Sequence, residues 1–233
     1  MWKLEEMGIV RWSDGDSSCR FDMRGGTESF SISPFVEMES SSRDSCLLVS
    51  AIEGQCLPKA SEQYVCRNRY TINYPQENGL YAIRFSIEPI SSTKDRLILE
   101  FTISIQTDLL DTHPMLDLHG LGRNAKSLTC SQDQENWRAD LGDLTSKTDP
   151  INTVEVDGSR CAVLLDRHDA PTTKNLGNQG ELRLRLFGDF LEKGVIRTAR
   201  PWVVFDRSGD QLDEKTLDSL YQDQEKRPLP LAT

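Results

Sequence analysis

The sequence predicts an all-β fold: a two-sheet antiparallel sandwich with one C-terminal helix. Apolar and polar residues alternate with period two along much of the chain, and a helical period occurs once, near the C-terminus. Hydrophobic residues make up 37% of the 233 residues and charged residues 27%, which is typical of sheets with one wetted face. An all-β chain of this length can form one domain, so we expect residues 1–233 to fold as a single β-sandwich.

The clearest alternation lies in the middle of the chain. Every second residue of 81–88 and of 97–106 is apolar, so one side of each segment can be buried while the other is wetted. Residues 89–94 lie between them and supply a turn. Together they predict a long antiparallel hairpin.

Six further segments have the composition of strands. They are 29–37, 46–52, 64–74, 161–165, 182–186 and 195–205. The first contains Pro34, which predicts an edge or bulged strand. The fourth is continuously apolar, which predicts a strand covered on both sides. In 64–74, we expect Tyr64, Cys66 and Tyr70 to share one face of a single strand.

The helix is predicted at about 212–226. Its apolar positions fall near one face: Leu212, Leu217, Leu220 and Tyr221. Asp210 or Asp213 can cap its N-terminus, and Pro228 ends it. We expect the apolar tail 229–231 to dock against the sandwich.

Residues 120–150 lack sustained periodicity and are rich in polar residues, which is typical of a functional or disordered loop. The six cysteines, at 19, 46, 56, 66, 130 and 161, include no Cys-x-x-Cys pair. We expect them to behave as small buried hydrophobes. Cys130, in the long loop, is the one for which a reactive thiol remains an alternative.

The chain is acidic: 27 Lys and Arg against 37 Asp and Glu give a formal net charge of −10. Such a surface repels phosphate backbones and anionic lipid, so we expect neither a nucleic-acid nor a membrane partner. The N-terminus lacks the apolar core of a signal peptide, which predicts a cytoplasmic location. The oligomeric state is left open.

Three histidines occur, and each follows an aspartate by two residues. The pairs are Asp111 with His113, Asp117 with His119 and Asp166 with His168. One hypothesis is that His113, His119, His168 and Asp166 meet in a pocket that performs acid–base chemistry or holds a metal. The alternative is that each pair satisfies itself locally. No known zinc spacing is present, so we expect no metal and no cofactor.

Arginines are frequent on the predicted strands. They are Arg67, Arg69, Arg84, Arg183, Arg185, Arg197 and Arg200. Guanidinium groups beside aromatic rings can bind a planar or hydroxylated ligand. The ligand-binding candidates are Arg69, Arg84, Asp111, Asp117 and Trp202. The alternative is a solvated face of weak ion pairs.

Long alternating strands, charged strand faces and histidines at strand ends resemble the galactose-mutarotase-like supersandwich over residues 5 to 205. The catalytic histidine of those enzymes lies in a different context, since Pro114, Gly120 and Asp169 follow the histidines here. The resemblance implies a concave sheet face suited to sugars and transfers no catalytic residue.

These observations favour a carbohydrate-binding module with its ligand near Arg69, Arg84 and the histidines. One alternative is a sugar-modifying enzyme of the mutarotase or lyase kind, with His113 or His168 as acid or base. The other is a protein-interaction domain that uses the long loop or an edge strand.

Overall fold

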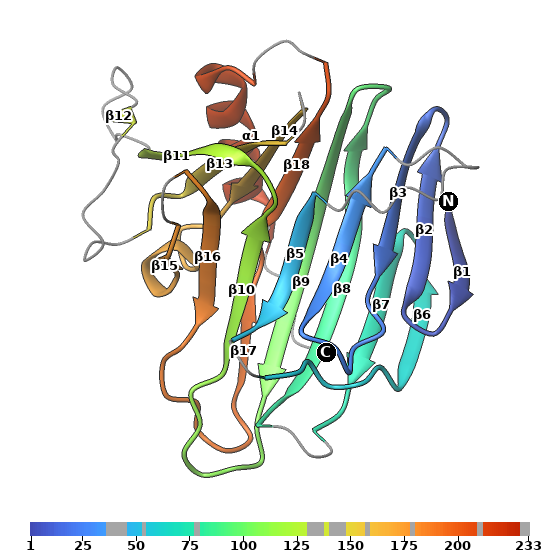
Figure 1. The fold of residues 1–233 in the computed structure, drawn as a ribbon, viewed down its shortest axis with the longest axis vertical. Coiled ribbons are helices and arrows are strands. Elements are labelled where there is room, and N and C mark those ends of the chain that lie inside the picture. Colours follow the sequence, from blue (N-terminus) through green and yellow to red (C-terminus); the bar gives the residue numbers. More distant parts are fainter. Residues whose placement is uncertain are drawn as a thin grey trace.

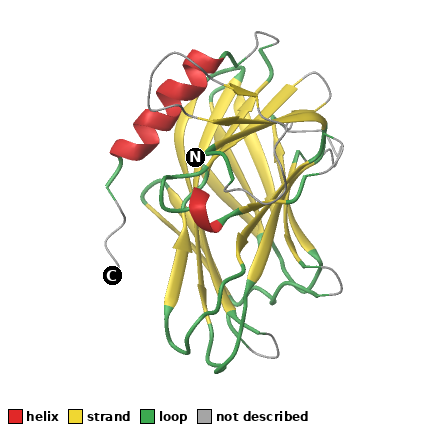
Figure 2. Cartoon of the chain, turned by 90° about the vertical axis from the view of Figure 1, so that its left-hand side faces the viewer, coloured by secondary structure: helices red, strands yellow, loops and turns green. Residues whose placement is uncertain are grey.

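Two antiparallel sheets face one another in the computed structural model, and one helix lies on the outside of the pair (Figures 1 and 2). The structure describes residues 1–35, 46–52, 55–76, 80–129, 138–139, 148–156, 159–177, 180–208 and 212–228. The predicted all-β sandwich with a C-terminal helix is confirmed.

The first sheet, sheet A, has eight strands in the order β1–β2–β3–β4–β5–β10–β16–β15. Their bounds are β1 Trp2–Glu6, β2 Ile9–Asp14, β3 Ser17–Asp22, β4 Ser29–Pro34, β5 Leu47–Ala51, β10 Met115–Gly120, β15 Lys174–Asn175 and β16 Leu182–Phe187. Neighbouring strands along the first five positions are also neighbours in sequence. Strands β10 and β16 then join from distant parts of the chain.

The second sheet, sheet B, runs β12–β11–β13–β14–β18–β9–β8–β7–β6, and β17 also pairs with β9. Its bounds are β6 Glu62–Cys66, β7 Arg69–Tyr74, β8 Ala82–Ser92, β9 Arg96–Gln106, β11 Arg123–Thr129, β12 Arg138–Ala139, β13 Ile151–Val156, β14 Ser159–Leu164, β17 Ile196–Ala199 and β18 Trp202–Asp206. The hairpin predicted in the middle of the chain is β8–β9. Strand β8 continues past Pro89 through an irregularity in register, so the connection is shorter than predicted.

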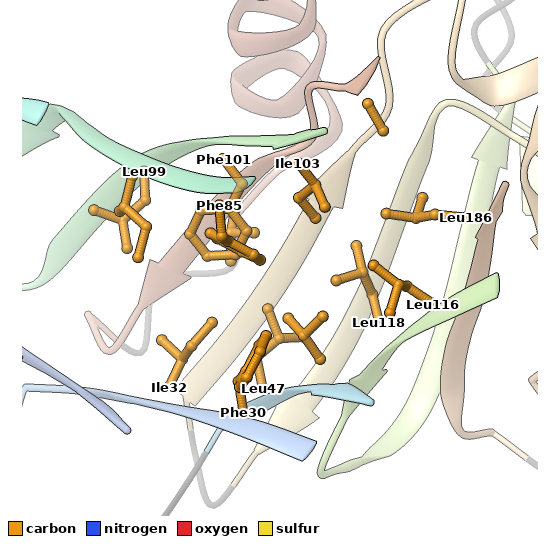
Figure 3. Packing of buried hydrophobic residues seen from close by; sticks show 14 of the residues in the cluster. Phe30, Ile32, Leu47, Phe85, Leu99, Phe101, Ile103, Leu116, Leu118 and Leu186 are labelled. Carbon is orange, nitrogen blue, oxygen red and sulfur yellow. The ribbon is translucent and has the colours of Figure 1, made fainter. Parts of the chain in front are cut away.

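The main core lies between the sheets and is built by the period-two pattern. Phe30, Leu116 and Leu118 of sheet A face Phe85 and Phe101 of sheet B (Figure 3). The rings of Phe85 and Phe101 meet edge to face with centroids 5.2 Å apart, an arrangement that aromatic pairs prefer. Because alternate residues point away from this core, each sheet also presents an outer face.

A second, smaller core lies between the outer face of sheet B and helix α1 (Glu214–Lys226). Leu217 of the helix packs against Leu164 and Trp202 of the sheet. The Asp213 side chain caps the helix by accepting a hydrogen bond from the Thr216 amide at 2.8 Å. The predicted apolar run beginning at Cys161 is indeed covered on both sides, since its alternate residues enter the two cores. The apolar tail 229–231 lies outside the described residues.

The single strand predicted over 64–74 is wrong. The chain reverses between Cys66 and Arg69 to form the β6–β7 hairpin, with Arg67 at φ 56°. Tyr64 and Cys66 are exposed because β6 is the last strand of sheet B, whereas Tyr70 on β7 is buried. A positive φ at arginine has no sequence signal, since arginine rarely adopts this conformation.

The edge position expected for Pro34 is also wrong. Strand β4 lies between β3 and β5, and Pro34 is its last residue, where the missing N–H interrupts little of the ladder. The segment predicted as one strand over 195–205 is divided into β17 and β18, which both pair with β9. Strands β1 to β3 were not predicted, and β11 begins inside the segment expected to be a loop.

The cysteines divide between the core and the surface. Cys19, Cys46 and Cys161 are buried, as expected, and burial raises the pKa of the Cys19 thiol well above its ordinary value. Cys56 and Cys66 are exposed, against expectation, because they lie in a connection and at a sheet edge. Cys130 lies outside the described residues. No helix among the described residues has the length and hydrophobicity to cross a membrane.

Candidate functional site

Four polar side chains project from the outer face of sheet A where β10 and β16 lie side by side. Leucines at alternate positions of both strands enter the core, so Asp117, His119, Arg183 and Arg185 point outward. The strand register places Asp117 opposite Arg185 and His119 opposite Arg183. Opposed side chains of this kind have Cβ atoms about 4.5–5.5 Å apart. We call this region, with Lys174 and Ser50 beside it, the β10–β16 face.

Asp117 is the centre of the β10–β16 face, and its side chain has no solvent exposure. Arg185 donates from Nε to Oδ1 at 2.8 Å and from Nη2 to Oδ2 at 3.0 Å. Arg183 donates from Nε to Oδ2 at 2.9 Å, and its Nη2 lies 2.7 Å from the same oxygen. Burial raises the pKa of Asp117, but the hydrogen bonds from Arg185 and Arg183 outweigh it and lower the pKa below its ordinary value. The carboxylate therefore stays ionised and fixes both guanidinium groups.

The neighbouring strands extend this arrangement across the sheet. Lys174 on β15 lies opposite Arg185, and Ser50 on β5 lies opposite Asp117 on its other side. The Arg183 side chain is 40% exposed and the Arg185 side chain 23%. The β10–β16 face thus combines half-buried hydroxyl and imidazole groups with partly exposed guanidinium groups.

A second buried carboxylate, Glu100, lies on the outer face of sheet B. It accepts a hydrogen bond from the Trp202 indole nitrogen at 3.0 Å. The guanidinium Nε of Arg227 lies 3.1 Å from Glu100, and Nη2 of Arg200 lies 3.6 Å away. Gln224 of α1 donates to the carbonyl of Arg200 at 3.0 Å, so the C-terminal part of the helix lies against this cluster. We call it the helix-covered cluster.

The ligand-binding candidates from the sequence fall on opposite sides of the sandwich. Arg69 and Arg84 lie on the outer face of sheet B, where Arg69 pairs with Glu88 at 2.6 Å and Arg84 donates to Asn73 at 3.0 Å. They therefore do not share a face with Asp117. Trp202 is buried against α1, so its ring is not available to a ligand. Asp111 is exposed in the connection between β9 and β10.

The structure separates the histidines along the chain and between the sheets. His113 is exposed before β10, 3.7 Å from Asp111 and with its ring centroid 5.9 Å from that of Phe190. His119 lies near the other end of β10. It is four residues after Met115, the first residue of that strand, which is about 13 Å of extended chain. His168 follows β14 of sheet B. His113 and His119 are thus too far apart to share a catalytic hydrogen bond, which corrects the expected convergence.

Asp166 and His168 form a local turn. The backbone amide of His168 donates to Oδ1 of Asp166 at 2.6 Å, and the exposed imidazole accepts from Nε of Arg167 at 3.3 Å. The alternative interpretation, in which an Asp-x-His pair satisfies itself locally, describes this pair. Within the described residues, no three His, Cys, Asp or Glu side chains form a set that could hold a metal ion.

Asp169 is a buried acid that the sequence did not single out. It accepts a hydrogen bond from the backbone amide of Arg200 at 2.5 Å. Burial raises its pKa to about 6, although that bond and the Arg200 charge act in the opposite direction. Lys174 and Ser50 were also missed, because only the strand order brings them to the β10–β16 face.

No protein-family model matches the chain, and no curated protein matches it. Solved structures to which the chain has a weak likeness include the following three. Heparan sulfate lyase HepC from Pedobacter heparinus has a TM-score of 0.43 and 11% identity, covering 86% of this chain and 35% of that one. A proposed kojibiose phosphorylase from the human microbiome has a TM-score of 0.44 and 12% identity, and the match covers 96% of this chain and 33% of that one. A GalM/aldose epimerase homologue from C. elegans has a TM-score of 0.35 and 10% identity, and the match covers 85% of this chain and 98% of that one.

The chain spans about a third of the length of the first two of these proteins.

Proposed function

We propose that this protein is a carbohydrate-binding β-sandwich that holds its ligand over the β10–β16 face. One observation carries the proposal: Asp117 fixes two arginines of one strand whose side chains remain partly exposed on the outer face of sheet A. The ligand position proposed from the sequence, over Arg69 and Arg84, moves to the opposite side of the sandwich.

Prepositioned guanidinium groups favour a ligand with several oxygen atoms. An arginine already held by a carboxylate loses little side-chain entropy when a ligand binds, and its planar fork donates parallel hydrogen bonds. Neighbouring strands are about 4.8 Å apart, and successive outward residues on one strand are about 6.8 Å apart. Donors at this spacing can contact different hydroxyl groups of one sugar ring or of two adjacent rings.

The geometry supports binding rather than acid–base catalysis at this position. Asp117 is engaged by two guanidinium groups and has a lowered pKa, so it is a poor proton acceptor at neutral pH. His119 lies on the same strand face, two residues along, with Arg183 as its cross-strand neighbour. We therefore assign Asp117 a positioning role and assign ligand contacts to Arg183, Arg185 and His119.

The test is a glycan array followed by isothermal titration calorimetry with the saccharides that bind. Arg183→Gln removes one donor from the β10–β16 face, and Arg84→Gln makes the same change at an exposed strand position on the opposite face. We expect Arg183→Gln to weaken binding about tenfold or more, the loss of one charge-assisted hydrogen bond, and Arg84→Gln to bind as the parent does.

Two results would overturn the proposal. One is an array on which no saccharide binds. The other is saccharide binding that Arg183→Gln leaves intact and Arg84→Gln removes, which would return the ligand to sheet B.

A further inference from the structure

The charges of the β10–β16 face do not balance. Lys174, Arg183 and Arg185 carry three positive charges, and Asp117 supplies one negative charge, so these four residues sum to +2. The whole chain has a formal net charge of −10. Among the described residues, no other carboxylate forms an ion pair with any of the three cations. A local excess of positive charge thus persists on an acidic protein.

Two of the cations occupy directly opposed positions on neighbouring strands. Lys174 is the direct cross-strand partner of Arg185, and like charges placed opposite one another destabilise a sheet. Asp117 offsets this repulsion only in part. A negatively charged group bound above the strands would remove the remainder.

Donors are available for such a group. Arg183 and Arg185 both use Nε and Nη2 to hold Asp117. Their Nη1 groups have no acceptor among the described residues. Because Asp117 takes Nε and Nη2 of each arginine, Nη1 is left for an outside ligand, and the exposed residue Lys174 is the cross-strand partner of Arg185. Guanidinium groups bind carboxylate and phosphate through parallel hydrogen bonds, and sulfate presents the same tetrahedral arrangement of oxygen atoms as phosphate.

We infer that the ligand of the β10–β16 face is an acidic saccharide, whose carboxylate or sulfate group lies against Arg183, Arg185 and Lys174. The inference rests on the proposed carbohydrate function and narrows it to one chemical class. Uronate and sulfate-ester sugars share the chemistry that the three cations recognise. The half-buried hydroxyl of Ser50 and imidazole of His119 are left for the uncharged positions of the sugar.

The experiment compares matched charged and neutral ligands by titration calorimetry on the full chain. One pair is an oligogalacturonate and its methyl ester, and the other is a sulfated dextran oligosaccharide and unsulfated dextran. We expect at least one charged member to bind about tenfold tighter than its neutral partner, because it gains a charge-assisted contact. We also expect this advantage to shrink as sodium chloride is raised from about 0.05 to 0.5 M. The first pair reports on carboxylate and the second on sulfate.

Two variants locate the effect. Lys174→Gln removes an exposed charge that holds no other described residue, so the fold should be unaffected; we expect it to reduce the preference for the charged ligand about threefold to tenfold. Arg84→Gln is the matched control and should leave the preference unchanged. Thermal unfolding of each variant confirms that it is folded.

The outcomes separate this inference from the broader proposal. If neutral and charged partners bind equally well and Lys174→Gln has no effect, the acidic class is overturned while carbohydrate binding stands. If none of the saccharides binds, and none binds on the array, both fail. If poly-L-glutamate binds as tightly as the best saccharide, the face is a general anion site and the saccharide assignment is overturned.

Discussion

Two buried carboxylates, Asp117 and Glu100, have nearly the same surroundings and lie on opposite faces of the sandwich. Each is held by two arginines, Asp117 by Arg183 and Arg185 and Glu100 by Arg200 and Arg227. The difference is the cover. Helix α1 packs on the outside of the sandwich (Figure 2), where its Gln224 donates to Arg200 beside Glu100, whereas the arginines of Asp117 have partly exposed side chains.

This contrast shows which part of a charge cluster can carry function. A buried acid between two arginines is by itself compatible with a purely structural role, as in the helix-covered cluster, where Arg200 is only 6% exposed. A binding role also requires the far ends of the cations to be open. The four predictions below test this distinction, from the largest expected effect to the smallest.

Removal of the covered carboxylate should have the largest effect on stability. Glu100→Ala leaves the buried Arg200 without its carboxylate and the Trp202 indole without its acceptor. We expect the free energy of unfolding to fall by about 3–5 kcal/mol. Asp117→Ala should cost less, about 1–3 kcal/mol, because water can solvate its partly exposed arginines. Urea unfolding measures both, and equal losses would remove the distinction between the two clusters.

The buried Asp169, hydrogen-bonded to Arg200, should make the free energy of unfolding depend on pH. Its pKa is raised to about 6, so the folded state prefers the protonated acid. The stabilisation is fully present below about pH 4 and is lost as pH rises through 6. Relative to Asp169→Asn, the parent should lose about 3 kcal/mol between pH 4 and pH 8. Asp117 acts in the opposite sense, since a lowered pKa stabilises the fold above about pH 4. A stability difference that does not change with pH would show that water reaches Asp169.

The indole of Trp202 should matter through its hydrogen bond as well as its packing. Trp202→Phe keeps an aromatic ring against α1 and removes the N–H that donates to Glu100. We expect a loss of about 2 kcal/mol, typical of a hydrogen bond to a charged group. Trp12→Phe, in the core between the sheets, controls for the lost ring volume. If both variants lose the same amount, the hydrogen bond to Glu100 contributes nothing measurable.

The smallest effect on stability is expected at His119. It projects from the open face of β10 and lies across from Arg183, so His119→Ala should change the free energy of unfolding by less than about 0.5 kcal/mol. The same variant should weaken saccharide binding. A large loss of stability would indicate that this side of the sandwich is structural too.

The spacing of apolar residues predicted strands and the helix well where one side of the element is buried. The alternation of 97–106 gave β9, and the continuous apolar run at 161–165 gave a strand packed in two cores. The helix begins after Asp213 because its carboxylate caps the first turn, a signal contained in a few residues. The reversal at Arg67 was missed because its positive φ depends on the hairpin around it.

The candidate site was predicted only in fragments. Alternation alone shows that Arg183 and Arg185 point away from the leucines of their strand. Their partner Asp117 is 66 and 68 residues away, and no local pattern connects them. The same holds for Trp202 and Glu100, which are 102 residues apart. The expected grouping of Arg69 and Arg84 with His119 failed because alternation does not show which of the two sheets a strand joins, and these arginines lie on sheet B whereas His119 lies on sheet A.

The sequence by itself determined that the strongly alternating segments are extended, which side of each is apolar, and where the α-helix starts. These features depend on contacts within a few residues, which composition and spacing record directly. Only the tertiary structure decided that β10 lies beside β16, that α1 packs against the cluster of Glu100 and that the arginines of Asp117 stay partly exposed. These arrangements are set by the packing of the whole core. Local alternation shows only that a charged residue points outward, and its neighbours depend on which strand pairs with its own.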